Sequence, residues 1–422
     1  MGPFDVLTIL LTLSGIFSYL NDRYIKMPIT IGVTFIGLVM SLAILILQHF
    51  TAVDFGPALK LLTQIDFGRT VFYALLGFLL FAGSLSIDVK ELKKERWGIL
   101  LLSTVSILIT TFLVGTLIFW LFKLMQVELS YSMAMVFGAL ISPTDPVVVL
   151  GVLRRKKDDV SEKFYSLMVG ESLFNDAMSI LIFTIALGIA EFDKKSVETM
   201  ETFHMTVEVL VQHVFGGIAL GMALGIIGVY FLRKVERAHV QILMTLGLVA
   251  SGYDLSQLLD VSSPLAVVIM GLIVGYYFRK SLEHDEEKIA DHLLFSFWEI
   301  IDEFLNSFLF IMVGIEILSL PTDSWKVFLM TPFTIVIVLF GRFGGLYPLL
   351  KFLPPFKGLG VDSGKVMTWA GMRGGISLAL ALLLPSGEQV THILFLTYNV
   401  VVFSILVQGL SINRFMNKYH RL

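Results

Sequence analysis

Long apolar segments recur along the whole chain and limit what it can fold into. A helix needs about 20 consecutive, mostly apolar residues to cross the hydrocarbon core of a bilayer. Segments of this kind cover most of the 422 residues, and only 15% of the residues are charged, against about 25% in soluble chains. The bilayer core holds no water that could pair backbone N–H and C=O groups, so a spanning segment must pair them within the protein. A helix does this within a single segment. The sequence predicts an all-α, polytopic membrane protein.

Thirteen segments meet the length rule, and 23 of the 31 Lys and Arg residues fall in one set of alternating loops between them, with six in the opposite set. Cytoplasmic loops collect Lys and Arg, so we expect a protein of the cell (cytoplasmic) membrane with its N-terminus outside and its C-terminus in the cytoplasm. The predicted spans are 4–20, 28–48, 70–88, 97–122, 131–153, 164–190, 206–232, 238–258, 263–278, 297–319, 327–350, 364–384 and 391–412.

Two of these spans contain residues that interrupt a helix. Span 131–153 contains "SPTDP", and span 364–384 contains "GMRGG". Proline removes a backbone donor and glycine loosens the chain, so both helices are expected to unwind near their middle. If 206–232 is a linker, each broken helix is the fifth of six in its half, and the two halves start on opposite sides. This order predicts two inverted six-helix repeats with crossing discontinuous helices, an arrangement that marks the binding site of secondary transporters.

The charged residues in the two breaks have an electrostatic explanation. A broken helix exposes N-terminal ends with partial positive charge and C-terminal ends with partial negative charge. Asp145 is expected to neutralise the positive ends and Arg373 the negative ends. We favour this structural role of Asp145 over direct ion binding, because an unpaired charge inside the membrane is costly.

Span 164–190 carries a pattern that suits a cation. At about 100° per residue, Glu171 lies one turn from Asn175 and Ser172 one turn from Asp176, which predicts one polar face. The oxygens of Asp176, Ser172 and the backbone near Thr144 are ligands that a hard cation such as Na⁺ prefers. The same carboxylate can hold a proton instead. One acid that holds either a cation or a proton, never both, is sufficient for exchange.

Glu171 is expected to have a different role from Asp176. Arg342 is another charged residue inside a predicted span, and an isolated charge at either position would be expensive. We therefore predict an ion pair between Glu171 and Arg342. The alternative for the whole polar set is a network that only holds helices together, but three acids exceed what packing requires.

Three motifs in this order, "SPTDPVVVLGVL", "GESLFNDAMSILIF" and "GMRGGISLALAL", resemble the NhaP/NHE-type sodium–proton antiporters of the monovalent cation:proton antiporter superfamily. The resemblance covers all thirteen spans and implies an NhaA-like fold. It implies that Asp176 binds Na⁺ or H⁺ with help from Ser172 and the Thr144 backbone. The Asn175–Asp176 pair resembles the Asn-Asp branch of the superfamily, which implies electroneutral one-for-one exchange.

The resemblance also implies how the chain is divided and assembled. It implies a homodimer in which a core bundle moves against a static scaffold, in an elevator-like form of alternating access. The scaffold or dimer helices are then 4–88 and 238–319, the core transport helices are 97–190 and 327–412, and 206–232 is the linker.

The predicted function is a secondary antiporter, not an enzyme, that exchanges Na⁺ for H⁺, with Li⁺ as a further candidate and no cofactor. K⁺/H⁺ exchange is the alternative, because the same oxygen ligands suit K⁺, and a cation channel is a rival from another class. An intramembrane hydrolase would need a nucleophile–base or metal constellation that the sequence lacks. Without a basic stripe, nucleic acid is not an expected partner. Glu299, Asp302 and Glu303 are expected to form a hydrated entrance that attracts cations, with a solvated helix end as the alternative.

Overall fold

The computed structural model describes residues 3–50, 68, 70–145, 149, 161–193, 199–284, 289–319, 325–359, 361–385 and 387–418, and all regular structure in these ranges is helical. The all-α prediction is confirmed. Within these ranges, seven helices are long and apolar enough to cross a membrane. They are Ile29–Leu47, Arg96–Leu124, Glu162–Ala190, Val211–Leu232, Ser263–Leu282, Trp325–Phe352 and Glu388–Lys418. The chain is a multi-pass membrane protein.

Each of the thirteen predicted spans falls on one or more helices, and the number that cross the bilayer stays a prediction. Among the described residues, four π-helical turns (η1, η2, η3 and η7) adjoin the α-helices, and two short 3₁₀ turns (η5 and η6) flank α16. The first part of the chain forms α1 (Pro3–Leu20), η1 (Asn21–Ile25), α2 (Ile29–Phe50), η2 (Thr70–Leu75), α5 (Leu76–Leu85), α6 (Val89–Lys94), α7 (Arg96–Leu101), η3 (Leu102–Ser106), α8 (Ile107–Leu124), α9 (Tyr131–Ile141), α11 (Glu162–Asp193) and α12 (Thr199–Leu232). The second part forms α13 (Ala238–Leu258), α14 (Ser263–His284), α15 (Ile289–Glu316), η5 (Ile317–Ser319), α16 (Trp325–Phe352), η6 (Pro354–Phe356), α17 (Val361–Ala370), α18 (Gly375–Leu382), α19 (Glu388–Phe403), η7 (Ser404–Gln408) and α20 (Gly409–Lys418).

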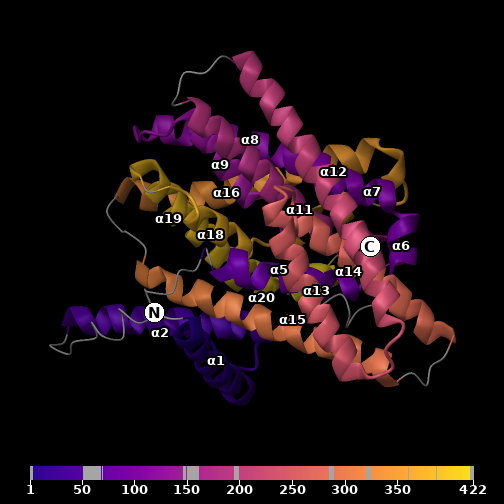
Figure 1. Ribbon diagram of the computed structural model, residues 1–422. Coiled ribbons are helices and arrows are strands. Elements are labelled where there is room, and N and C mark those ends of the chain that lie inside the picture. The colour runs from indigo at the N-terminus through magenta and orange to yellow at the C-terminus, as the bar shows by residue number, and fades with distance from the viewer. Residues whose placement is uncertain are drawn as a thin grey trace.

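The helices pack in two groups. In one group, α2 lies against α1 and α15, and α5 packs on α14 and α15, with α12 and α13 beside α14. In the other, α9 packs between α8 and α11, and α16 contacts α8, α17 and α19, with α18 against α19. Figure 1 shows α8, α9, α16, α18 and α19 together on one side of the molecule, and α1, α2 and α15 on the other.

The crossing of α2 and α15 illustrates how closely the first group packs. Gly37 and Gly314 meet there, and a Cβ on Gly314 would lie 2.8 Å from the carbonyl oxygen of Thr34. The Thr34 hydroxyl also donates a hydrogen bond to the carbonyl of Phe310 on α15, at 3.1 Å. In a membrane the hydrophobic effect contributes little to helix association. Small residues at an interface let two helices approach closely, so that packing and hydrogen bonds hold them together. These contacts hold α2 and α15 together as one unit.

Both predicted helix interruptions are present. The first broken helix stops at Ile141, and residues 142–145 continue without helical structure. The second stops at Ala370 and resumes at Gly375 after four non-helical residues. Of the predicted span 131–153, residues 146–148 and 150–153, including Pro146, lie outside the described residues. The two breaks produce the helix ends from which the site is built.

The π-helical turns were not predicted. The sequence predicted uninterrupted helices over 97–122 and 391–412, but π-helical turns interrupt them at Leu102–Ser106 and Ser404–Gln408. A π-helical turn hydrogen-bonds five residues back instead of four and widens the helix locally. Such a turn shifts the spacing of apolar and polar residues along a helix. In a helix that is apolar on all sides there is no such spacing, so the sequence gives no sign of the turn.

Candidate functional site

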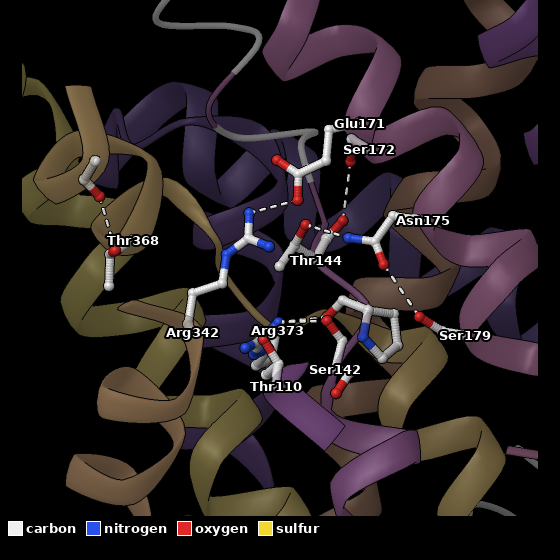
Figure 2. Close-up of polar contacts among 12 residues, drawn as sticks. Thr110, Ser142, Thr144, Glu171, Ser172, Asn175, Ser179, Arg342, Thr368 and Arg373 are labelled. Carbon is white, nitrogen blue, oxygen red and sulfur yellow. Dashed lines mark hydrogen bonds and ion pairs between the residues drawn. The ribbon is translucent and has the colours of Figure 1, made fainter. Parts of the chain in front are cut away.

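The two breaks cross each other and are joined by backbone and side-chain hydrogen bonds. The amide of Asp145 in the first break donates to the carbonyl of Met372 in the second, at 2.8 Å. The guanidinium of Arg373 donates to the carbonyls of Ser142 and Pro143, at 2.8 and 2.9 Å. These carbonyls lie at the C-terminal end of α9, where the helix dipole is negative. Arg373 therefore makes the contact that the sequence predicted for it (Figure 2).

Asp145 lies against the start of α18. Gly374 is the residue before this helix, and a Cβ added to it would overlap the carboxylate and Cβ of Asp145. The first N–H groups of a helix carry partial positive charge and have no partner within the helix. The counter-charge role expected of Asp145 requires a position of this kind, and the role itself stays a prediction. The close approach also explains why a glycine stands at 374.

We expect Gly374→Ala to lower the free energy of unfolding by about 1–3 kcal/mol, because the added methyl group overpacks a filled site against Asp145. Gly247→Ala on α13 is the matched control, since a Cβ there meets no atom within 4 Å. Thermal unfolding of both variants in detergent checks the prediction. Equal melting temperatures for the two variants would show that Asp145 does not fill the space beside Gly374.

The polar residues of α11 lie on two adjacent faces and not on the single face that was predicted. Ser172 and Asp176 line a cavity, together with Asp145. Glu171 and Asn175 are buried behind this wall, with 1% and 0% of their surface exposed, and point toward α16 and the first break. Adjacent positions on a helix differ by about 100°. When the row Ser172–Asp176 faces the cavity, the neighbouring row Glu171–Asn175 therefore faces the protein interior.

The ion pair predicted between Glu171 and Arg342 is present. A guanidinium nitrogen of Arg342 lies 2.6 Å from the Glu171 carboxylate, and both side chains are 2% exposed. Figure 2 shows Arg342 reaching from α16 toward Glu171 on α11. The pair compensates two charges that the surrounding apolar core would otherwise penalise.

A chain of hydrogen bonds orients Asn175. The Asn175 amide nitrogen donates to the Thr144 hydroxyl at 2.7 Å, and the Ser179 hydroxyl donates to the Asn175 amide oxygen at 3.0 Å. The Ser172 hydroxyl donates to the Thr144 carbonyl at 2.9 Å (Figure 2). The hydrogen bonds from Ser172 and Asn175 to Thr144 connect α11 to the first break. Ser179 was not predicted, although its spacing of four residues from Asn175 places it on the same row of the helix.

The cavity has a volume of about 480 Å³ and is lined by Asp145, Ser172 and Asp176 of the site and by charged residues of α6, α14 and α15. Asp302 and Glu303, two of the three acids expected at an entrance, line it, and the Asn306 amide donates to Asp302 at 3.2 Å. Glu299 lines an adjoining cavity of about 350 Å³. The polar residues along the larger cavity are Ser86, Asp88, Glu91, Asp145, Tyr165, Ser166, Ser172, Asp176, Arg279, Asp302, Glu303 and Asn306.

The lining of the cavity includes Ser86, Asp88 and Arg279, which lie at the helix ends that the sequence assigned to the cytoplasmic side. Asp88 caps the short helix α6 there, and Arg279 near the end of α14 donates to the Ser86 carbonyl at 2.7 Å. A cavity lined by several carboxylates attracts cations. At its inner end it presents carboxylate and hydroxyl oxygens, which can bind a hard monovalent cation or, at the carboxylate, a proton.

Comparison with known proteins places the chain among ion exchangers. The family model described as sodium/hydrogen exchanger, transmembrane, matches residues 8–418. The Na⁺/H⁺ antiporter NhaP of Pseudomonas aeruginosa is 37% identical, over 99% of this chain and 97% of its own. The Na⁺/H⁺ antiporter NhaH of Halobacillus dabanensis is 28% identical, over 94% of this chain and 93% of its own.

The fold also matches a solved structure. The sodium proton antiporter MjNhaP1 from Methanocaldococcus jannaschii, determined at pH 8, superposes with a TM-score of 0.73 at 18% sequence identity. The match covers 98% of this chain and 97% of that one. At this identity the likeness shows the shared fold.

Proposed function

Because the chain belongs to the sodium/hydrogen exchanger family, we propose that it is a secondary antiporter that exchanges Na⁺ for H⁺ across the cell membrane. The observation that carries the proposal is a cavity that leads from charged helix ends to Asp176, beside two crossing helix breaks. The N-terminus lies outside and the C-terminus in the cytoplasm, so the cavity opens to the cytoplasm.

Asp176 holds the cation or the proton. Its carboxylate and the hydroxyl oxygen of Ser172 face the same cavity. Ser172 uses its hydrogen in the bond to the Thr144 carbonyl, so the lone pairs of the hydroxyl oxygen remain free for a cation. Na⁺ then binds the ionised Asp176 with Ser172 and the backbone at Thr144. A proton on Asp176 removes the charge that holds Na⁺, so the two ions compete for one carboxylate.

The other polar residues of the site keep the exchange electroneutral. Asn175 carries no charge and is held by Thr144 and Ser179. Glu171 is compensated by Arg342, and Asp145 lies against the start of α18. One titrating carboxylate then exchanges one cation, Na⁺ or Li⁺, for one proton. The transport cycle moves no net charge and avoids the cost of about 2.3 kcal/mol per charge per 100 mV of membrane potential.

Alternating access moves one bundle against the other. The core (97–190 and 327–412) supplies Asp145 and Asp176, and the scaffold (4–88 and 238–319) supplies the acids on α15 across the cavity. A cavity lined by both bundles closes on one side and opens on the other when the core slides in the manner of an elevator. The scaffold also forms the contact of a homodimer.

The experiment is a flux assay in proteoliposomes that contain a trapped pH dye. Pulses of Na⁺, Li⁺ or K⁺ are applied at zero and at an imposed membrane potential. We expect a pH change with Na⁺ and Li⁺ that is independent of the potential. A response to K⁺ alone would change the substrate to K⁺, and an ion current without proton flux would indicate a channel instead of an antiporter.

A further inference from the structure

The π-helical turn Ser404–Gln408 (η7) packs against the end of α17, beside the second helix break. Both end residues are buried, each with 1% of its surface exposed. The Ser404 hydroxyl donates to the Gln408 amide oxygen at 2.6 Å. The Gln408 amide nitrogen donates to the carbonyl of Trp369, at 2.9 Å. The turn therefore links α19 to α17 through one oriented amide.

The Trp369 carbonyl needs this donor because α17 ends one residue later. In an unbroken helix it would accept the N–H of residue 373, but α17 stops at Ala370. The nearby amides of Gly371 and Met372 donate to the carbonyls of Met367 and Ala370. Helix ends leave carbonyls that need partners from elsewhere, and Gln408 supplies a partner from outside the helix.

The same turn borders both buried arginines. A cavity of about 10 Å³ is lined by Arg342, Gly371, Arg373, Ser404 and Gln408, among others. A Cβ on Gly371 would lie 2.8 Å from Nε of Arg342. The end of α17, the Arg342 side chain and the turn are therefore packed as one group, and a shift of the turn moves the groups that hold the two breaks together.

We propose that Gln408 is a positioning residue of the transport site. By holding the Trp369 carbonyl it fixes the segment 371–374, in which the Met372 carbonyl accepts the Asp145 amide and Arg373 binds the end of α9. The inference rests on the proposed function, since it assigns Gln408 to the geometry of the Na⁺ site. Gln408 does not line the cavity that contains Asp176, so it acts through the break and not on the ion.

The test uses Gln408→Met, which keeps the length of the side chain and removes the donor. We expect faster amide hydrogen exchange over 371–374 and a KM for Na⁺ raised about 5–10-fold, as the loss of one buried hydrogen bond predicts, with a smaller change in kcat. Asn399→Leu is the matched control on α19, because the Asn399 amide donates to the Phe395 carbonyl of its own helix, at 2.8 Å. It should leave both readouts at the wild-type values.

The outcomes separate the two proposals. A wild-type protein without Na⁺-driven proton flux would overturn the proposed function. Hydrogen exchange over 371–374 in the wild type and in Gln408→Met would still measure whether Gln408 stabilises this segment. An active wild type, with Gln408→Met unchanged in exchange over 371–374 or in KM, overturns the positioning role. Ser404→Ala keeps the amide but removes the hydroxyl that orients it, and decides the question if Gln408→Met fails to fold. We expect it to raise KM in the same direction, and an unchanged KM overturns the proposal.

Discussion

Replacing Asp176 by asparagine is expected to abolish Na⁺-driven proton transport while the protein stays folded. The amide has nearly the shape of the carboxylate but can neither bind a proton nor attract Na⁺ with a full charge. Asp176 lies on the cavity wall, so the loss of its charge leaves no partner charge buried. The pH-dye assay in proteoliposomes measures the transport, and size-exclusion chromatography with thermal unfolding measures the fold.

Asp254→Asn is the matched control for this substitution. Asp254 lies exposed on α13, so the same change of chemistry there should leave transport at the wild-type rate. If Asp176→Asn transports at a rate near that of the control, Asp176 is not the carboxylate for which Na⁺ and H⁺ compete. An unfolded Asp176→Asn protein would instead indicate a structural role for this acid.

Replacing Arg342 by alanine is expected to destabilise the protein by about 3–5 kcal/mol, because Glu171 is then left charged and buried without its partner. Asp176→Asn should cost much less. The double variant Arg342→Ala/Glu171→Ala should recover part of the loss, since it removes both charges. Chemical or thermal unfolding in detergent of the wild type, both single variants and the double variant gives the coupling energy of the pair.

A surface ion pair supplies the comparison. The Nζ atom of Lys365 lies 3.0 Å from a carboxylate oxygen of Asp362, but the two side chains are 45% and 53% exposed. Lys365→Ala should therefore change stability by about 0–1 kcal/mol. If Arg342→Ala is no more destabilising than Lys365→Ala, or if the double variant is as unstable as the sum of the single variants, the pair does not compensate buried charge as proposed.

The parts of the site that could be predicted from the sequence are those in which a costly residue requires an explanation. Prolines and glycines inside long apolar spans predicted both breaks. The ion pair was predictable because two of the charges inside spans, on Glu171 and Arg342, each needed a partner. The contact of Arg373 with the end of α9 followed from the sign of the helix dipole.

Other features could not be predicted because the residues involved are inexpensive in a membrane helix. Gln408 and Ser179 are neutral, and nothing in an apolar run distinguishes an amide that bridges two helices from one that bonds within its own helix. The separation of Ser172 and Asp176 from Glu171 and Asn175 depends on where α16 and the cavity lie around α11. That placement is a property of tertiary packing and has no counterpart in the spacing of residues.

The hydrogen bond between the two breaks has a consequence for how this protein can change in evolution. It joins the amide of residue 145 to the carbonyl of residue 372, and every amino acid except proline supplies that amide. The side chain at either of these two positions can therefore change without removing the bond, and alanine scanning cannot detect it. Selection can therefore alter the side chains at these two positions while the backbone bond between the breaks is kept, whereas the contacts of Arg373 and the space at Gly374 depend on those residues themselves.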